Sequence, residues 1–184
     1  MIETILLAML VAKIKGYKLK PFFKSLSAYP VIIFSFIYIF IGISIFYGNY
    51  SFIKYEVWLE KIYILMFIPL IFKYKLYISS IIGSLFIFIG TYLNNIAINV
   101  NNGKMPVFPT LSYITGYVKP DSFSKIKDIH ILGDNSTKLK LLTDYIDLGY
   151  SILSIGDIFI RFFTFIVIFD FIKYININLK EKTS

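Results

Sequence analysis

The stretch that decides the fold is LYISSIIGSLFIFIGTYLNNIAINV, from Leu76 to Val100, which contains no charged residue. A helix that spans a bilayer needs about 20 mostly apolar residues, and this run is long enough. A second uncharged run, YPVIIFSFIYIFIGISIFY, extends from Tyr29 to Tyr47. Only 16% of the chain is charged, against about 25% in soluble domains. The sequence therefore predicts an all-α integral membrane protein, with residues 1–184 forming a single membrane domain.

Three further segments are candidates for crossing the bilayer. Val57 to Lys75 is apolar in its middle and carries Trp and Lys residues at its ends, which are typical anchors at a membrane interface. Ile155 to Ile175 is long enough to span despite its charges. Residues 1–13 are short, and their charges follow the apolar part, an order wrong for a cleaved signal peptide. We expect a bundle of five transmembrane helices, or four with the first helix lying in the interface.

The distribution of lysines predicts the orientation. If successive connections alternate between sides, one side carries ten lysines and only two acids, whereas the other carries eight lysines and seven acids. Lysines in short loops favour the cytoplasm. We therefore expect a multi-pass protein of a bacterial cytoplasmic membrane with a cytoplasmic C-terminus. The ten lysines are Lys13, Lys15, Lys18, Lys20, Lys24, Lys73, Lys75, Lys173, Lys180 and Lys182, and Lys127 belongs to the other set.

The connection of residues 101–149 is then extracytoplasmic. Its many large apolar residues are too numerous to leave in water, so we expect a small ordered cap. LSYITGYV (residues 111–118) and IKDIHIL (residues 126–132) have the composition of short strands. STKLKLLTDYIDL (residues 136–148) is expected to form one or two helical turns.

NNGKMPV, residues 101–107, ends the uncharged helix. Asn94 and Asn101 lie two turns apart on one helix face. Because a buried amide needs a partner, this face should look into the bundle or into a wet cavity. One interpretation is a helix end followed by a turn at Gly103 and Pro106. The alternative is the floor of a polar pocket, with Asn94, Asn101, Gly103, Met105 and Pro106 binding a ligand.

SIGD, residues 154–157, opens the last helix. Ser154 with an acid three residues later is a capping-box pattern, and Gly156 lies between them. Asp157 and Arg161 are spaced to neutralise each other. The functional alternative makes Asp157 a catalytic carboxylate, with Asp144 as its most plausible partner. In either case we expect Asn94 or Asn101 to lie within hydrogen-bond reach of Asp157.

The chain has no cysteine and one histidine, His130, and no cluster of acids accompanies that histidine. We expect His130 to face solvent or pack on the loop. The sequence thus predicts no metal site and no cofactor.

The order of these motifs resembles the bacterial membrane family called domain of unknown function 5317. The resemblance rests on LNNIAINVNNGKMPV, HILGDNSTKLKLLTDYID and SIGDIFI, and covers about Leu93 to Ile160 by motif. Asn102 replaces the middle Gly of the family's N-G-G-x-M-P-V turn. The residues on the pattern are Leu93, Asn94, Asn101, Gly103, Met105, Pro106, Val107, Thr137, Leu139, Asp144, Ser154, Gly156 and Asp157. The resemblance implies a bacterial membrane protein and implies no reaction.

The layout also resembles that of lipoprotein signal peptidases, which are small membrane proteins with two intramembrane aspartates. That resemblance implies Asp157 and Asp144 as a dyad in which one carboxyl acts as base and the other as acid. The G-N-x-x-D-R motif of those enzymes is absent here.

Three functions follow as expectations. The first is a non-enzymatic envelope protein whose cap and polar helix ends bind a partner protein or an envelope ligand such as a lipid. The second is an intramembrane aspartyl hydrolase or transferase, and the third is a small-solute transporter, although no internal repeat supports it. Beyond the bilayer itself, no nucleic-acid partner is expected.

Overall fold

The computed structural model describes residues 2–125 and 128–181. Lys127 and Lys182, which were counted in the charge distribution, lie outside these ranges. The chain is 67% helical with little sheet, which confirms the predicted helical class. It divides into two compact units. Unit 1 comprises Met1–Ile39, Trp58–Ile87 and Arg161–Ser184, and unit 2 comprises Phe40–Val57 and Phe88–Ile160.

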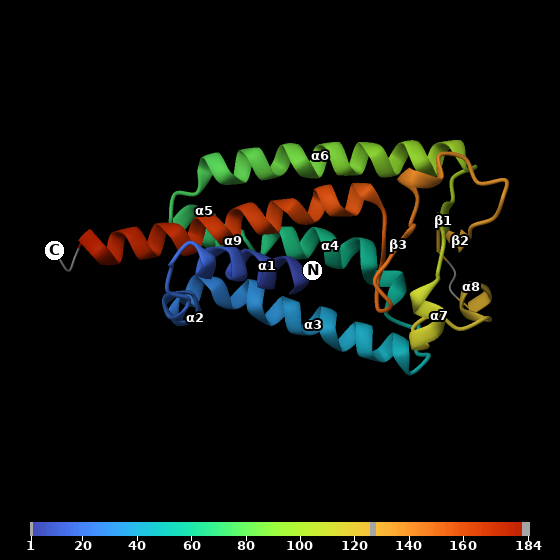
Figure 1. Cartoon of the computed structure of the whole chain (residues 1–184), viewed down its shortest axis with the longest axis horizontal. Coiled ribbons are helices and arrows are strands. Elements are labelled where there is room, and N and C mark those ends of the chain that lie inside the picture. Colours follow the sequence, from blue (N-terminus) through green and yellow to red (C-terminus); the bar gives the residue numbers. More distant parts are fainter. Residues whose placement is uncertain (1, 126–127, 182–184) are drawn as a thin grey trace. The chain divides into compact units, whose positions relative to one another are not determined.

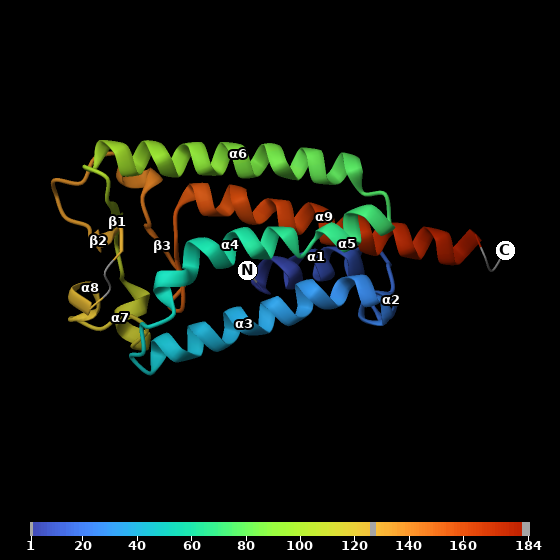
Figure 2. The same ribbon diagram turned by 180° about the vertical axis from the view of Figure 1, so that it is seen from behind.

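The regular secondary structure described in unit 1 consists of helices joined by short turns. In Figures 1 and 2, α1 lies between the first turns of α3 and the later turns of α9. Its elements, some of which extend into unit 2, are α1 (Ile2–Ile14), α2 (Lys20–Lys24), η1 (Leu26–Ala28), α3 (Tyr29–Phe46), α4 (Glu56–Leu65), α5 (Ile68–Lys73), α6 (Tyr77–Val100) and α9 (Ile155–Glu181).

Aromatic rings fill the core of unit 1. Phe67 is fully buried and meets Tyr63 and Phe163 edge to face, with ring centroids 5.3 and 5.2 Å apart. Phe22 of α2 and Phe171 of α9 are also fully buried, with ring centroids 5.6 Å apart. Edge-to-face pairs of this kind add to the free energy gained from burial alone. This aromatic column therefore joins α2, α4, α5 and α9.

The segment from Val57 to Lys75, which was expected to cross as one helix, is divided into two helices. The structure has α4 ending at Leu65 and α5 beginning at Ile68, with Pro69 in the first turn of α5. Proline has no backbone N–H to donate to a carbonyl four residues earlier, but it fits the first turn of a new helix. The interruption is held in place by the burial of Phe67.

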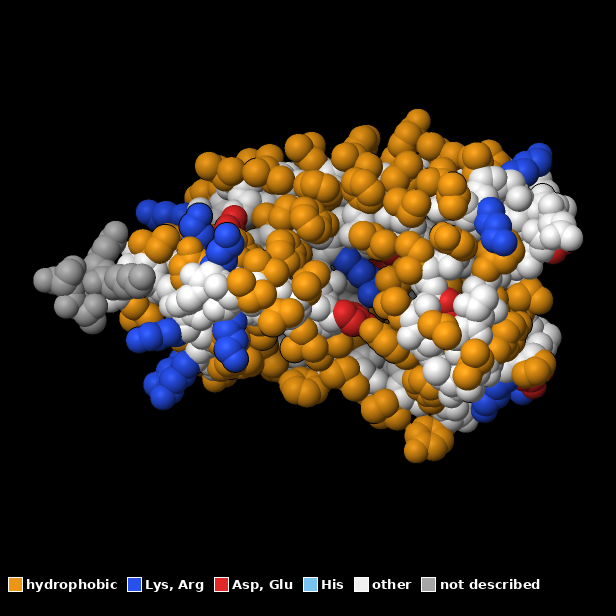
Figure 3. Space-filling model, viewed as in Figure 1, with side chains coloured by type: hydrophobic (Ala, Val, Ile, Leu, Met, Phe, Trp, Pro, Cys, Tyr) orange, Lys and Arg blue, Asp and Glu red, His pale blue; other side chains and the backbone are white. Residues whose placement is uncertain are grey.

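Two stretches in the described chain are long and apolar enough to cross a membrane, Leu26–Phe46 and Tyr77–Val100. Only 17% of the most apolar window of each is buried, whereas the core helix of a soluble protein would be mostly buried. Large side chains such as Phe36 and Ile78 are 63% and 76% exposed. Figure 3 shows hydrophobic side chains along α6. The outer faces of these helices are thus suited to lipid.

Unit 2 combines helix ends with short strands and turns. It contains the last turns of α3 and α6 and the first turn of α9. The remaining elements are η2 (Ile53–Tyr55), β1 (Met105–Val107), α7 (Leu111–Thr115), α8 (Ser122–Lys125), β2 (His130–Leu132), η3 (Lys140–Leu142), β3 (Ile146–Asp147) and β4 (Ile152–Leu153).

The strand β1 is the centre of a small parallel arrangement. It pairs with β2, placing Met105 opposite His130, and Val107 forms a parallel bridge with Asp144 on the other side. Separately, β3 and β4 form an antiparallel pair. Of the strand expected in residues 126–132, residues 130–132 form β2, residues 128–129 form a bend, and residues 126–127 lie outside the described ranges. The helical turns expected in residues 136–148 are limited to η3.

The strand predicted for residues 111–118 is wrong, because residues 111–115 form helix α7 and Gly116 ends it. The Asp147 carboxylate accepts hydrogen bonds from the backbone N–H groups of Thr110 and Ser112, at 2.6 and 2.8 Å, and thus satisfies the start of α7. Gly116, with φ of 79°, ends the helix in the left-handed conformation. A tertiary contact overrides the local β propensity here.

Candidate functional site

A closed ring of hydrogen bonds joins α6 to the start of α9. Asn94 Nδ2 donates to Asp157 Oδ1 at 2.9 Å, and Ser154 Oγ donates to Asn94 Oδ1 at 2.7 Å. The predicted capping box is present, since Ser154 N donates to Asp157 Oδ2 and Asp157 N donates to Ser154 Oγ, both at 2.9 Å. Asn94 thus completes a local cap from a second helix.

Two glycines allow the helices to approach closely enough for this ring. A Cβ built on Gly156 would lie well under 3.0 Å from Asn94 Oδ1 and from the Gly90 carbonyl oxygen. A Cβ on Gly90 would in turn collide with the Gly156 carbonyl oxygen. The small residues here therefore serve backbone contact, as they do at other close helix crossings.

The predicted contact between Asn94 and Asp157 is present, and the predicted partner of Arg161 is different. The Arg161 guanidinium forms an ion pair with Glu3, with Nη1 at 3.6 Å from the carboxylate Oε2. Both carboxylate oxygens of Asp157 are occupied by Asn94 and Ser154. This arrangement stabilises a helix start, and it engages both carboxylate oxygens of Asp157 in hydrogen bonds within the cap.

NNGKMPV has the structure of a helix end that leads into a strand. Asn102 and Gly103 take the left-handed conformation, with φ of 58° and 78°. Asn101 is the first residue after α6, and its side chain donates to the Lys138 carbonyl at 3.0 Å and accepts from the Lys138 N–H at 2.9 Å. Met105, buried in β1, is fixed by a backbone bond to Ile129. The Asn101 side chain thus pairs with both backbone groups of Lys138, as a neighbouring strand would, and fixes the loop that follows β2.

The second group of ionisable side chains surrounds His130. Its Nδ1 lies 2.7 Å from Asp128 Oδ2, and its Nε2 lies 3.4 Å from Asp144 Oδ2. Asp128 lies in the bend just before β2, where its Oδ1 accepts a hydrogen bond from the His130 backbone N–H at 2.8 Å, so the carboxylate is held beside the imidazole. Because β1 lies between β2 and the Asp144 segment, the imidazole reaches Asp144 across the central strand. The structure therefore pairs Asp144 with His130, while Asp157 pairs with Asn94 and Ser154.

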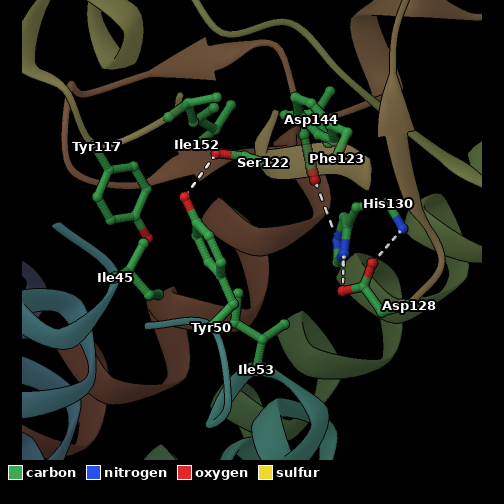
Figure 4. Close-up of a pocket in the computed structure, with 12 residues that line it drawn as sticks. Ile45, Tyr50, Ile53, Tyr117, Ser122, Phe123, Asp128, His130, Asp144 and Ile152 are labelled. Atoms are coloured by element: carbon green, nitrogen blue, oxygen red, sulfur yellow. Dashed lines mark hydrogen bonds and ion pairs between the residues drawn. The ribbon is translucent and has the colours of Figure 1, made fainter. Parts of the chain in front are cut away.

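These three side chains line one side of a cavity of about 120 Å³ within unit 2. Figure 4 shows Tyr50, Ile53 and Tyr117 around the same space, with the Tyr50 hydroxyl hydrogen-bonded to Ser122 Oγ at 2.8 Å. The other lining residues are Ile45, Val107, Val118, Phe123 and Ile152. The cavity thus combines apolar and aromatic walls with carboxylates and an imidazole on one side.

The charge on Asp128 is stabilised despite its partial burial. Burial by itself would raise the pKa of this carboxyl, but hydrogen bonds from the side chain and backbone of His130 outweigh it and hold the pKa below its ordinary value. The nearby Lys104 acts in the same direction. Asp128 therefore remains a carboxylate, an acceptor of hydrogen bonds, at any physiological pH.

Sequence reasoning named Asp144 as a candidate partner of Asp157, did not name Asp128, and expected His130 to face solvent or pack on the loop. The available clue was the Asp-x-His sequence, because an aspartate side chain can accept a hydrogen bond from the backbone N–H two residues further on. In the part of the chain that the structure describes, no group of three His, Cys, Asp or Glu side chains is arranged to hold a metal ion.

A family model described as "Family of unknown function (DUF5317)" matches residues 19–169. This match covers most of the chain, and the chain therefore belongs to that family, as the motifs indicated. No curated protein and no solved structure matches it.

Proposed function

We propose that this member of the DUF5317 family is a multi-pass protein of a bacterial membrane, and that it binds a small envelope ligand in the cavity beside His130 without transforming it. The observation that carries the proposal is the composition of that cavity. Fixed hydrogen-bond acceptors lie on one side and apolar walls surround the rest, which is the usual character of a ligand pocket.

The membrane assignment is supported by the exposed apolar faces of α3 and α6. The proposal extends it to five crossings made by α1, α3, the α4 and α5 pair, α6 and α9. Helix α1 has 13 residues, so it is about 20 Å long and reaches across only by thinning the bilayer or by snorkelling of Lys13. The orientation follows from the lysines, with residues 101–154 outside the cell and the C-terminus inside.

The topology is tested with reporter fusions. A reporter after Ser184 should be active in the cytoplasm, and one inserted at Ser124 should be active outside it. Both reporters on one side of the membrane would overturn the five-crossing arrangement.

The chemistry of the cavity specifies the ligand. An ionised aspartate accepts hydrogen bonds and cannot donate them. The aromatic and aliphatic walls favour an apolar body of modest size. The cavity therefore suits a small amphipathic ligand, or a group at the end of a larger one, that presents a hydroxyl or N–H donor to the carboxylates.

Binding without catalysis is favoured by the way the carboxylates are used. An aspartyl hydrolase needs two carboxylates that share a proton around a water molecule. Here Asp157 is engaged by Asn94 and Ser154, and Asp144 faces His130. The two aspartates proposed as a dyad thus belong to separate hydrogen-bonded groups.

Calorimetry on the detergent-solubilised full chain tests the cavity, with phenol as a donor probe and toluene as its apolar counterpart. Phenol should bind more tightly than toluene, and Asp144→Asn should weaken phenol binding about 10-fold or more, because a hydrogen bond to a charged acceptor is lost. The exposed Asp121→Asn provides the control for the loss of one charge. Equal binding of both probes, or equal weakening by Asp121→Asn, would overturn the assignment.

A further inference from the structure

Eight exposed lysines gather in unit 1 on segments that lie close together. Figure 3 shows blue side chains concentrated where α2 lies. Within the described residues, none of the eight forms an ion pair with a carboxylate. They are Lys13, Lys15, Lys18, Lys20 and Lys24 between α1 and η1, Lys73 and Lys75 after α5, and Lys173 on α9. We call these eight residues the basic surface.

Hydrogen bonds fix the backbone that carries the basic surface. Asn176 on α9 accepts from the Lys18 N–H at 2.8 Å and donates to the Lys18 carbonyl at 3.0 Å, so one amide side chain holds both backbone groups. Asn176 is itself buried. α9 therefore carries a buried polar residue at this position, and its contact with Lys18 holds the lysine-rich loop between α1 and α2 in one conformation.

The second lysine segment is tied to the same place. The Tyr74 hydroxyl and Ser25 Oγ are 2.8 Å apart, and the Tyr74 ring packs on Phe171 with centroids 4.6 Å apart. Lys75 has a φ of 53°, in the left-handed region, where the chain turns into α6. The two lysine-bearing connections and α9 thus form one ordered surface, and their positive charges are held together against mutual repulsion.

Exposed apolar side chains lie among these lysines. Phe23, Leu26, Tyr77 and Tyr174 are all exposed, and Tyr74 is in ring contact with Tyr174. Tyrosines and lysines together are characteristic of the boundary between headgroups and acyl chains, where the aromatic body lies in the apolar layer and the ammonium group reaches the phosphates. A surface built for a soluble polyanion would not need exposed Phe and Leu.

We propose that the basic surface of unit 1 binds the phosphate headgroups of anionic phospholipids. Clusters of lysines next to a membrane-spanning helix attract such lipids, and each lysine near the surface raises the affinity about fivefold. The inference rests on the bilayer placement proposed above but not on the cavity beside His130. On this proposal the basic surface distinguishes anionic from neutral lipid headgroups. A general bias of lysines to the cytoplasmic side does not require such a distinction.

Native mass spectrometry of the full chain in detergent tests the preference, with dioleoyl phosphatidylglycerol and dioleoyl phosphatidylcholine as the two probes. The wild-type protein should retain the phosphatidylglycerol preferentially, and raising the salt concentration should weaken this preference. Replacing Lys18, Lys20 and Lys24 together by Gln should lower the affinity for phosphatidylglycerol about 100-fold and leave that for phosphatidylcholine unchanged. Replacing Lys54, Lys119 and Lys138 of unit 2 by Gln removes the same charge and should have little effect.

A second variant tests whether the fixed position of the lysines matters in addition to their number. Asn176→Ala keeps every lysine but releases the Lys18 backbone, so it should reduce the preference for phosphatidylglycerol several-fold. Equal retention of the two lipids by the wild-type protein, or equal losses in the two triple variants, would overturn the inference. Displacement of the lipid by inorganic polyphosphate at equal phosphate concentration would overturn it too, in favour of a general polyanion surface. Failure of the bilayer placement is detected separately by the reporter fusions.

Discussion

Asn94 Nδ2 donates to Asp157 Oδ1 over 2.9 Å, which ties the second-last turn of α6 to the first turn of α9 across 63 positions of sequence. The same amide accepts from Ser154 Oγ, so a single side chain satisfies two partners of the cap. The Asn94 amide therefore holds the end of α6 against the start of α9 within unit 2.

Asn94→Ala should destabilise the protein by about 1–3 kcal/mol, because it removes the partners of a carboxylate and a buried hydroxyl. The midpoint of thermal unfolding in detergent, converted to free energy, measures the loss. Asn95→Ala, at an exposed position on the same helix, is the matched control. If both variants unfold at the same temperature, the ring of hydrogen bonds contributes nothing to stability.

Gly156→Ala should be more damaging than an ordinary helix substitution, because the new Cβ would collide with Asn94 Oδ1 and the Gly90 carbonyl oxygen. We expect a loss of at least about 1–3 kcal/mol, as for overpacking elsewhere. Gly42→Ala is the comparison, since nothing lies within 4 Å of a Cβ at Gly42. That variant should be neutral or stabilised by up to about 1 kcal/mol, because alanine is the better helix former. Similar effects of the two substitutions in thermal unfolding would show that the helices can separate without cost.

Acid should weaken unit 2 through Asp147. Burial alone would raise the pKa of this carboxyl, but hydrogen bonds from the Ser112 side chain, and from the backbone N–H groups of Ser112, Gly149 and Thr110, lower it below the ordinary value of 3.8. A carboxyl with a lowered pKa in the folded state stabilises the fold above its unfolded pKa. That stability is lost as the pH falls from about 3.8 towards the folded pKa.

Unfolding by urea between pH 6 and pH 3 measures this loss, and Asp147→Asn should be less stable at pH 6 while showing a smaller decline on acidification. Asp128 and Asp134 also have lowered pKa values and act in the same direction, so the decline should shrink without disappearing. An unchanged pH dependence in Asp147→Asn would contradict the role given to this cap of α7.

Trypsin should cleave the connection of residues 101–154 slowly, because this segment is folded into unit 2. The bond after Lys138 is protected by Asn101, whose side chain holds both backbone groups of Lys138. Asn101→Ala should therefore accelerate cleavage after Lys138 several-fold, measured by mass spectrometry of the fragments. Asn99→Ala, at an exposed position two residues earlier and inside α6, is the control. Rapid cleavage throughout residues 110–142 of the wild-type protein would show that the segment is a tether.

Some features of the site could be predicted because local chemistry specifies them. Ser154 and Asp157 form a capping box from residues three positions apart, and their helix begins at Ile155 as the motif indicates. The contact with Asn94 was also predictable, because a buried amide needs a partner and the end of α6 and the start of α9 were expected at one membrane depth. The cavity was not predictable, because its lining residues come from segments more than 100 positions apart, from Ile45 to Ile152.

The sequence by itself determined the helical class, the uncharged lengths of α3 and α6, and the end of α6 before Asn102 and Gly103, since these depend on side chains within a turn or two of each other. Tertiary structure alone decided that residues 111–115 are a helix, because the cap comes from Asp147, and that Asp144 faces His130, because β1 lies between their segments. Local propensities are worth only fractions of a kcal/mol per residue, whereas a carboxylate left without partners costs more. The long-range hydrogen bonds therefore determine the conformation where the two conflict.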